Sequence, residues 1–213
     1  MYKNLNPDKA LIWRIVHRDN LDWILEHGVY ASSSNHRSDD WVSIGSEELI
    51  DKRSRREVPV APGGTLSDYV PFYFTPFSPM LYNIKTGRGG VIQRNNEEIV
   101  ILVSSLHDVH QAGLSYVYTD CHAYSALANY YNEPDSLSEI DWELIQKRDF
   151  KRAPDDLGKL DRYQAEALIH RHFPISLLKG IVCFNENVKQ ATEQKAAKHG
   201  QNPKIIARSE WYF

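Results

Sequence analysis

The first half of the chain alternates short β-branched or aromatic runs with short amphipathic segments. Residues 11–17, 69–74 and 99–103 are rich in Ile, Val, Tyr and Phe, which predicts strands. A helix is predicted after the first of them, from an N-cap at Asp19 to a stop at Gly28. Strands and helices that do not follow a regular β–α–β order indicate an α+β fold.

Two further helices have clear boundary signals. Ser46 is followed by two Glu residues, a capping signature, and the helix that it opens ends in the basic cluster 52–56. Pro79 opens the other helix, which runs to Gly87. In the second predicted strand, Pro71 cannot donate to a β-ladder, so we expect this strand at the edge of a sheet.

The second half of the chain is more broken. Its predicted elements are short helices over 122–131 and 141–148, a strand over 181–184, a polar helix over 186–199 and a closing pair of strands over 204–213. Segment 163–170 fits a helix and a strand equally well, because so short a run does not reveal its period. The charged stretch 133–160 is long for a loop, which indicates a function. Without repeats or linkers, we expect one domain over 1–213.

Composition and charge narrow the class of protein. The chain is 42% hydrophobic and 25% charged, enough for a core without disulfides or metal ions. Its apolar runs are far shorter than the ~20 residues that cross a bilayer, and its two cysteines form no CxxC pair. These features predict a cytoplasmic protein with no membrane association and no metal site. A net charge of −3 argues against coating duplex DNA, although a local basic patch is compatible with it.

Common catalytic motifs are absent. The chain has no GxxxxGK[ST], GxGxxG, HExxH or GxSxG, which argues against a nucleoside triphosphatase, a Rossmann dehydrogenase and an α/β hydrolase. His170 and His172 have no Cys or carboxylate pair nearby, so we interpret them as ordinary histidines and not as metal ligands.

Three features could carry chemistry. The basic cluster 52–56 is by default a solvated helix end, and its alternative role is an anion clamp. Glu166 would face a cleft if its segment is a strand and would be ordinary surface if it is a helix. In the proline-stiffened run 71–80, Phe72 and Phe74 are expected in the core. Tyr73 points the other way and could stack on a flat ring such as nicotinamide or a base.

Five segments in a fixed order carry a resemblance to a known family. They are the run 11–20, the pair Lys52-Arg53, the block 63–74, the triplet Gln164-Ala165-Glu166 and the terminal Trp211-Tyr212-Phe213. Together they resemble DarT, a family of bacterial DNA ADP-ribosyltransferase toxins. The match extends from about Lys9 to the end of the chain, and the proline-aromatic block and the Gln-Ala-Glu triplet are its most specific parts.

The resemblance implies an ADP-ribosyltransferase fold, in which two small sheets with flanking helices surround a cleft for NAD⁺, the co-substrate. It implies that ADP-ribose is transferred from NAD⁺ to a base, thymidine, within a short motif of single-stranded DNA. It also implies a partner, the macrodomain antitoxin DarG, which removes the modification. The alternatives are a related enzyme that modifies RNA or protein or hydrolyses NAD⁺, and a non-catalytic nucleotide-binding module.

By position, the resemblance assigns catalysis to Arg53 and Glu166. The residues that it assigns to NAD⁺ are Arg14, Ile15, Val16, Trp23, Ala31, Arg53 and Tyr73, with Tyr73 stacked on the nicotinamide. The residues expected to contact DNA are Met80, Arg88, Arg94, His122, Lys147 and Arg148, and the loop region 122–166 receives the strand. Many members of the family have His at the Arg14 position, so NAD⁺ contacts there are expected to differ in this chain.

The chemistry of the reaction agrees with these roles. Nicotinamide leaves as a neutral group, so no general acid is needed, and a carboxylate such as that of Glu166 can stabilise the positive charge that develops on the ribose. The thymine nitrogen must lose its proton, a task that the family account gives to Arg53. Because a guanidinium stays protonated in proteins, we expect Arg53 instead to hold phosphates or the developing thymine anion. Single-stranded DNA is expected because base pairing hides the reacting nitrogen.

Overall fold

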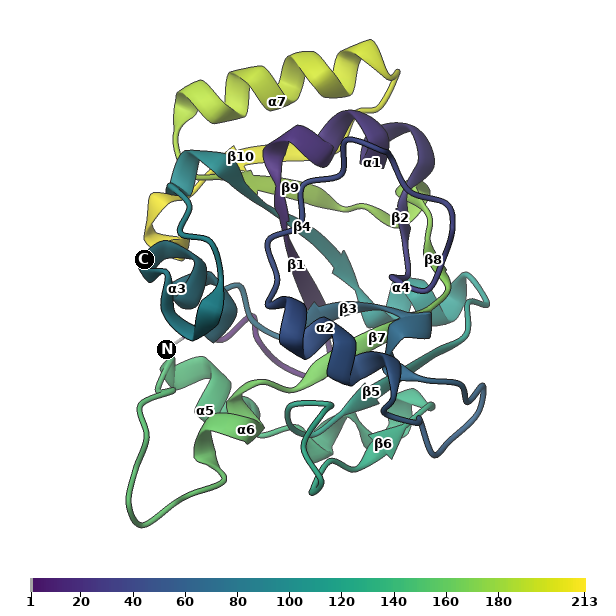
Figure 1. Ribbon diagram of the computed structural model, residues 1–213, viewed down its shortest axis with the longest axis vertical. Coiled ribbons are helices and arrows are strands. Elements are labelled where there is room, and N and C mark those ends of the chain that lie inside the picture. Colours follow the sequence, from purple (N-terminus) through teal and green to yellow (C-terminus); the bar gives the residue numbers. More distant parts are fainter. Residues whose placement is uncertain (1) are drawn as a thin grey trace.

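The computed structural model describes residues 2–213. They form one large mixed β-sheet and one small antiparallel β-sheet, with helices packed around them (Figure 1). The larger sheet has the strand order β10-β9-β4-β1-β3-β7-β5-β6, and the smaller sheet pairs β2 with β8. The strands are β1 (Leu11–His17), β2 (Val29–Tyr30), β3 (Tyr69–Tyr73), β4 (Ile99–Ser105), β5 (Tyr116–Thr119), β6 (Tyr130–Tyr131), β7 (Glu166–His170), β8 (His172–Phe173), β9 (Gly180–Cys183) and β10 (Lys204–Ala207).

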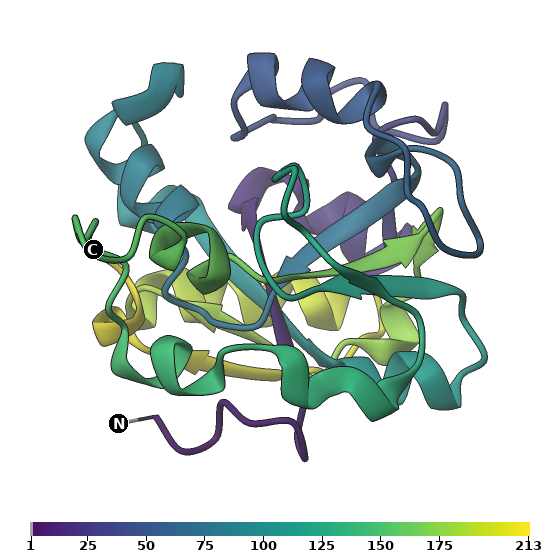
Figure 2. The same cartoon turned by 90° about the horizontal axis from the view of Figure 1, so that it is seen from below.

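The α-helices are mostly short. They are α1 (Leu21–His27), α2 (Glu47–Ser54), α3 (Pro79–Thr86), α4 (Leu106–Gln111), α5 (Trp142–Lys147), α6 (Lys159–Tyr163) and α7 (Glu186–Lys198). The longest, α7, packs on α1 and on the β9–β10 end of the sheet, whereas α2 and α3 lie apart from each other (Figures 1 and 2). Within residues 2–213, no helix is both long enough and apolar enough to cross a membrane.

The larger sheet opens between its two central strands. β1 pairs with β4 along its whole length, and β3 pairs with β7 over five residues, but β1 and β3 meet only at Trp13 and Tyr73. Beyond that pair the strands diverge, and Arg14 Nη1 donates a hydrogen bond of 2.8 Å to the Pro71 carbonyl. The edge position predicted for β3 is therefore wrong. Pro71 is tolerated in a central strand because the divergence leaves no ladder for it to donate to.

Most predicted boundaries are confirmed. The first strand covers 11–17 as expected, and α1 ends at Gly28, whose φ of 77° favours glycine. The Ser46 hydroxyl caps α2 by accepting a hydrogen bond of 3.4 Å from the Leu49 N–H. The ambiguous segment 163–170 contains both structures, because α6 ends at Tyr163 and β7 begins at Glu166.

Three local predictions are wrong. Asp19 does not cap a helix, since residues 18–20 form a 3₁₀ turn and α1 begins after Asn20. Residues 122–131 form a loop that leads into β6, because the Ala123 N–H is bound by a carboxylate of another strand. The closing segment provides one strand, β10, which is parallel to β9. The chain then turns inward, where the Tyr212 hydroxyl donates to the Val182 carbonyl at 2.9 Å.

Candidate active site

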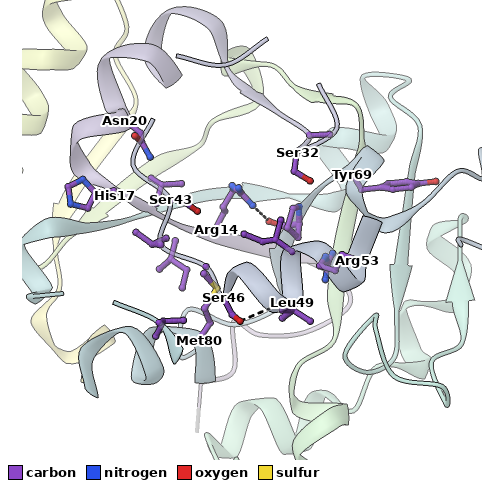
Figure 3. Close-up of a pocket in the computed structure, with 18 of the residues that line it drawn as sticks. Arg14, His17, Asn20, Ser32, Ser43, Ser46, Leu49, Arg53, Tyr69 and Met80 are labelled. Atoms are coloured by element: carbon purple, nitrogen blue, oxygen red, sulfur yellow. Dashed lines mark hydrogen bonds between the residues drawn. The ribbon is translucent and has the colours of Figure 1, made fainter. Parts of the chain in front are cut away.

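A cavity of about 300 Å³ occupies the place where β1 and β3 diverge. Its walls come from these two strands, the segment 30–46, α2, α3 and the start of β7 (Figure 3). It brings together every residue predicted to contact NAD⁺ or to act in catalysis: Arg14, Ile15, Val16, Trp23, Ala31, Arg53, Tyr73 and Glu166. These residues are spread over more than 150 positions of the sequence, so the fold itself assembles the site.

Glu166 is the buried carboxylate of the site, with 1% of its surface exposed. It opens β7, and its backbone N–H donates to the Thr119 hydroxyl at 3.2 Å. Its Oε1 accepts a hydrogen bond of 2.9 Å from the Ala123 N–H, and its Oε2 accepts one of 2.9 Å from Arg53 Nη1. Burial alone would raise the pKa of Glu166. Arg53, His122 and the Ala123 N–H outweigh burial and lower this pKa, so the carboxylate is ionised at neutral pH.

Arg53 reaches the cavity from the last turn of α2. Its Nη1 forms the ion pair with Glu166, while its Nη2 is buried and donates to no group of the described protein. One edge of the guanidinium is thus held by the carboxylate, and the other is available to a ligand. The anion-clamp interpretation of the basic cluster 52–56 fits Arg53, because Lys52 and Arg55 instead pair with Glu48 and Asp51 on the exposed face of α2.

Arg14 points into the cavity from β1. Its Nη1 is bound to the Pro71 carbonyl, and its Nε is buried without a hydrogen-bond partner among the described residues. Burial, and to a lesser extent the charge of Arg53, lowers the pKa of Arg14 to about 10. This pKa is still well above 7, and its guanidinium is therefore charged at neutral pH. A buried, unpaired N–H is costly unless a bound group satisfies it, so the Arg14 Nε is a donor available to a ligand.

Tyr73 presents its ring to the same space. Phe72 and Phe74 are fully buried in the core, as predicted, and Tyr73 alternates with them along β3 and lines the cavity. Its hydroxyl donates a long hydrogen bond of 3.8 Å to Met80 Sδ. Burial and the nearby Glu166 raise the pKa of Tyr73 well above its usual range, so the phenol is neutral.

His122 lies beside the Glu166 carboxylate. Its Nδ1 accepts a hydrogen bond of 3.3 Å from the Tyr124 N–H, so a neutral His122 carries its proton on Nε2, which lies 3.9 Å from Glu166 Oε1. The ring therefore faces Glu166 as a donor. Its loop is held in place by Arg56, whose Nη2 donates to the Ser125 carbonyl at 3.1 Å.

Comparison with known proteins decides the family. A family model described as the ssDNA thymidine ADP-ribosyltransferase DarT matches residues 13–213. The chain belongs to the DarT family. A DNA ADP-ribosyl transferase of Escherichia coli O127:H6 is 55% identical over 210 residues, which are 99% of this chain and 96% of that protein.

Solved structures of DarT from Thermus sp. 2.9 share the fold. The structure in complex with ADP-ribosylated ssDNA has a TM-score of 0.89 at 33% identity and covers 98% of both chains. The complex with NAD⁺ has a TM-score of 0.83, also at 33% identity, and covers 98% of this chain and 100% of that one. These matches confirm the α+β ADP-ribosyltransferase fold and an NAD⁺-dependent DNA ADP-ribosyltransferase, with one refinement: the larger of the two DarT sheets here has eight strands.

The six residues predicted to contact DNA do not lie together. Met80 and His122 line the cavity of this DarT chain, whereas Arg88, Arg94, Lys147 and Arg148 lie outside it. Arg88 is exposed, with its guanidinium over the Tyr82 ring.

The other three cations outside the cavity already have partners. Arg94 pairs with Glu98 at 3.3 Å, and Lys147 pairs with Glu143 on its own helix at 2.5 Å. Arg148 stacks on Phe77, with its guanidinium carbon 3.5 Å from the ring centroid. Arg88 is thus the predicted cation most available to a phosphate.

Sequence reasoning missed two contributors to the site. The first is the Ala123 N–H, which binds Glu166, and the second is Asn20, a buried residue that holds the cavity wall through Val42. Both act through hydrogen bonds to residues distant in the sequence. The sequence predicted a helix cap at the neighbouring Asp19, and no signal in it pointed to Asn20.

Proposed function

We propose that the protein transfers ADP-ribose from NAD⁺ to thymidine in single-stranded DNA, with Glu166 and Arg53 as its catalytic residues. The observation that carries the proposal is the buried, ionised Glu166 carboxylate, held by Arg53 and the Ala123 N–H at a cavity that also presents Arg14 and Tyr73. A non-catalytic binding module gains nothing from an ionised carboxylate at 1% exposure, because its desolvation is costly.

NAD⁺ suits the donors and surfaces of the cavity. The unpaired Arg14 Nε and Arg53 Nη2 require acceptors, which the phosphates and the carboxamide of a dinucleotide can supply. Tyr73 offers a flat ring for nicotinamide, and Trp23 offers a second aromatic surface. We assign Ile15, Val16 and Ala31 to the apolar contacts with NAD⁺, because all three lie on the cavity wall.

Glu166 supplies the charge that the reaction needs. As nicotinamide departs, positive charge grows on the ribose, and a fixed carboxylate in a buried site stabilises it without reorganisation. The hydrogen bonds from Arg53 and Ala123 orient this carboxylate and keep it ionised before the substrate enters. A general acid is not required, because the leaving group is neutral.

The side chains of the cavity are poor acceptors for the proton of the thymine nitrogen. Arg14 and Tyr73 are both protonated at neutral pH, as their pKa values of about 10 and well above 10 indicate. Among residues 2–213, Glu166 is the only carboxylate that lines the cavity, and its lowered pKa makes it a weak base. We therefore assign Arg53 to the developing thymine anion, which its free Nη2 can bind, and we assign the proton to solvent water.

An oligonucleotide assay tests the proposal. The full-length protein is incubated with NAD⁺ and single-stranded oligonucleotides that either contain or lack thymidine, and the intact mass of the DNA is then measured. The expected result is the addition of one ADP-ribose to thymidine-containing strands and much less addition to the same strands annealed to a complement. An unchanged DNA mass, with modified RNA or free ADP-ribose instead, would favour the alternative activities.

The cellular context follows from the same chemistry. We propose that the protein acts in the cytoplasm, where DNA and NAD⁺ are both present, and that it is a toxin whose modification is removed by a DarG-like macrodomain antitoxin. Expression in bacteria should stop growth, and co-expression of such a macrodomain should restore it. If the macrodomain leaves ADP-ribosylated thymidine in place, the proposed partnership is wrong.

A further inference from the structure

The segment 32–57 forms one wall of the cavity and carries Arg53, yet none of its residues is buried. Its central part, residues 35–46, contains no helix or strand, and we name it the strap. Trp41, Ile44 and Ser46 of the strap line the cavity, and the strap leads directly into α2. Trp41 and Ile44 pack against the hydrophobic core but stay partly exposed, so specific hydrogen bonds are also needed to fix the position of this wall.

Asn20 provides those bonds. Its side-chain amide donates to the Val42 carbonyl at 2.9 Å, and its carbonyl oxygen accepts from the Val42 N–H at 2.8 Å. Both polar ends of one buried side chain, at 4% exposure, are thus used on a single strap residue. The geometry reproduces the paired hydrogen bonds of a β-ladder where the strap has no strand beside it.

The other hydrogen bonds of the strap are local. The Trp41 N–H donates to Ser38, the Asp40 N–H to the Ser38 hydroxyl, and the His36 N–H to the Ser34 hydroxyl. Among the described residues, the hydrogen bonds that join the strap to the rest of the protein are those of Asn20. Asn20 itself follows β1, the strand that carries Arg14, so it is fixed to the opposite wall of the cavity.

We infer that Asn20 is a positioning residue that pre-forms the NAD⁺ cavity by clamping the strap at Val42. The inference rests on the proposed function for the identity of the ligand. Without the clamp, NAD⁺ would have to order the strap as it binds, and that entropy cost appears as weaker binding. Chemistry at saturating NAD⁺ should change much less, because Glu166 belongs to β7 and is held by Ala123, and its ion pair with Arg53 still holds that guanidinium.

The test compares Asn20→Ala and Asn20→Asp with wild type. Asp keeps the acceptor for the Val42 N–H but places a carboxylate against the Val42 carbonyl, so both variants should lose the clamp. We expect the Kd for NAD⁺, measured by calorimetry, and the KM for NAD⁺ to rise about tenfold, equivalent to ~1.4 kcal/mol, while kcat falls less than about threefold. Trypsin should cut faster after Arg37, an exposed strap residue, in both variants.

Asn96→Ala is the matched control. Asn96 is also buried, and its side chain donates to the Phe213 carbonyl at 3.0 Å, but it does not line the cavity. Its loss should lower the melting temperature without changing the Kd for NAD⁺ or the trypsin cut at Arg37. Unchanged NAD⁺ affinity and unchanged cleavage in the Asn20 variants, or an equal rise of Kd in Asn96→Ala, would overturn the inference.

The failure of this inference can be told from a failure of the proposed function. If wild type binds NAD⁺ but modifies no DNA, the proposed activity is wrong, and the calorimetry and the trypsin cleavage still test the clamp. If an Asn20 variant does not fold, hydrogen exchange of the Val42 amide in wild type replaces it. Protection of that amide above the amides of residues 36–41 supports the clamp, and equal exchange refutes it.

Discussion

Replacing Glu166 by Gln removes the charge of the carboxylate while keeping its shape. The amide oxygen can still accept from the Ala123 N–H or from Arg53, whose bonds to the carboxylate are both 2.9 Å long. Glu166→Ala is a less informative change, because it has several effects at once. It would create a cavity, and it would leave both the Ala123 N–H and the Arg53 guanidinium without their partner. The Gln variant therefore separates the charge of Glu166 from its contribution to folding.

The expected magnitudes differ for the two properties. A buried group that stabilises transition-state charge is typically responsible for about 10²–10³-fold in kcat, and we expect a loss of this size. The amide oxygen keeps one of the two hydrogen bonds, the other is lost against the amide NH₂, and the Arg53 charge loses its counter-ion, which costs about 3–5 kcal/mol of unfolding free energy. Domains have about 5–15 kcal/mol of stability, so the variant should stay folded at 25 °C.

The assay is the rate of ADP-ribose addition to a thymidine-containing oligonucleotide at saturating NAD⁺, followed by mass spectrometry, with urea unfolding of the same samples. Glu186→Gln is the control, because Glu186 pairs with Lys189 on α7 and does not line the cavity. It should retain wild-type activity. A Glu166→Gln rate within about tenfold of wild type would refute the electrostatic role.

Further predictions concern the other side chains and pH. Arg53→Lys should lower kcat about tenfold or more, because an ammonium lacks the planar fork by which one edge of a guanidinium binds Glu166 while the other edge faces the substrate. Tyr73→Phe should leave the KM for NAD⁺ within about twofold of wild type, whereas Tyr73→Ala should raise it about tenfold, a stacking loss of ~1.4 kcal/mol. In salt titrations of single-stranded DNA binding, Arg88→Ala should reduce the slope by about 1, while NAD⁺ affinity stays unchanged. Because the folded pKa of Glu166 lies below its ordinary 4.5, the stability that its charge adds is present above pH 4.5 and is lost as the pH falls below it. In urea unfolding, the stability difference between wild type and Glu166→Gln should therefore shrink below that pH.

The parts of the fold that the sequence predicted correctly are those set by neighbouring residues. Ser46 caps the helix that directly follows it, and Gly28 ends α1 through its own φ. At the end of β3, Phe72 and the following Phe74 point to the core, whereas Tyr73 between them points to the opposite face. These signals act over a few positions, so they can be read without the rest of the chain. The single domain and the roles of the site residues stay predictions.

The wrong predictions depend on contacts that are distant in the sequence. Residues 122–131 have a helical pattern, but the Ala123 N–H is taken by Glu166, which lies 43 positions further on. Arg148 looks like a free cation of the charged stretch, yet it lies over the Phe77 ring. No local period reveals a partner that the fold brings from another element, and the same limit hid the clamp of Asn20 on Val42, 22 positions away.

For Pro71, the predicted loss of a ladder donor is correct, but the predicted position at the edge of the sheet is wrong. Its missing N–H does mark a position without a ladder bond, but the missing ladder lies inside the sheet, where β3 leaves β1. The Pro71 carbonyl still needs a donor there, and Arg14 Nη1 supplies it. That bond fixes the Arg14 guanidinium at the mouth of the divergence with its Nε left for a ligand. The same proline that interrupts the sheet thus helps to orient a charged donor in the cavity that the interruption creates.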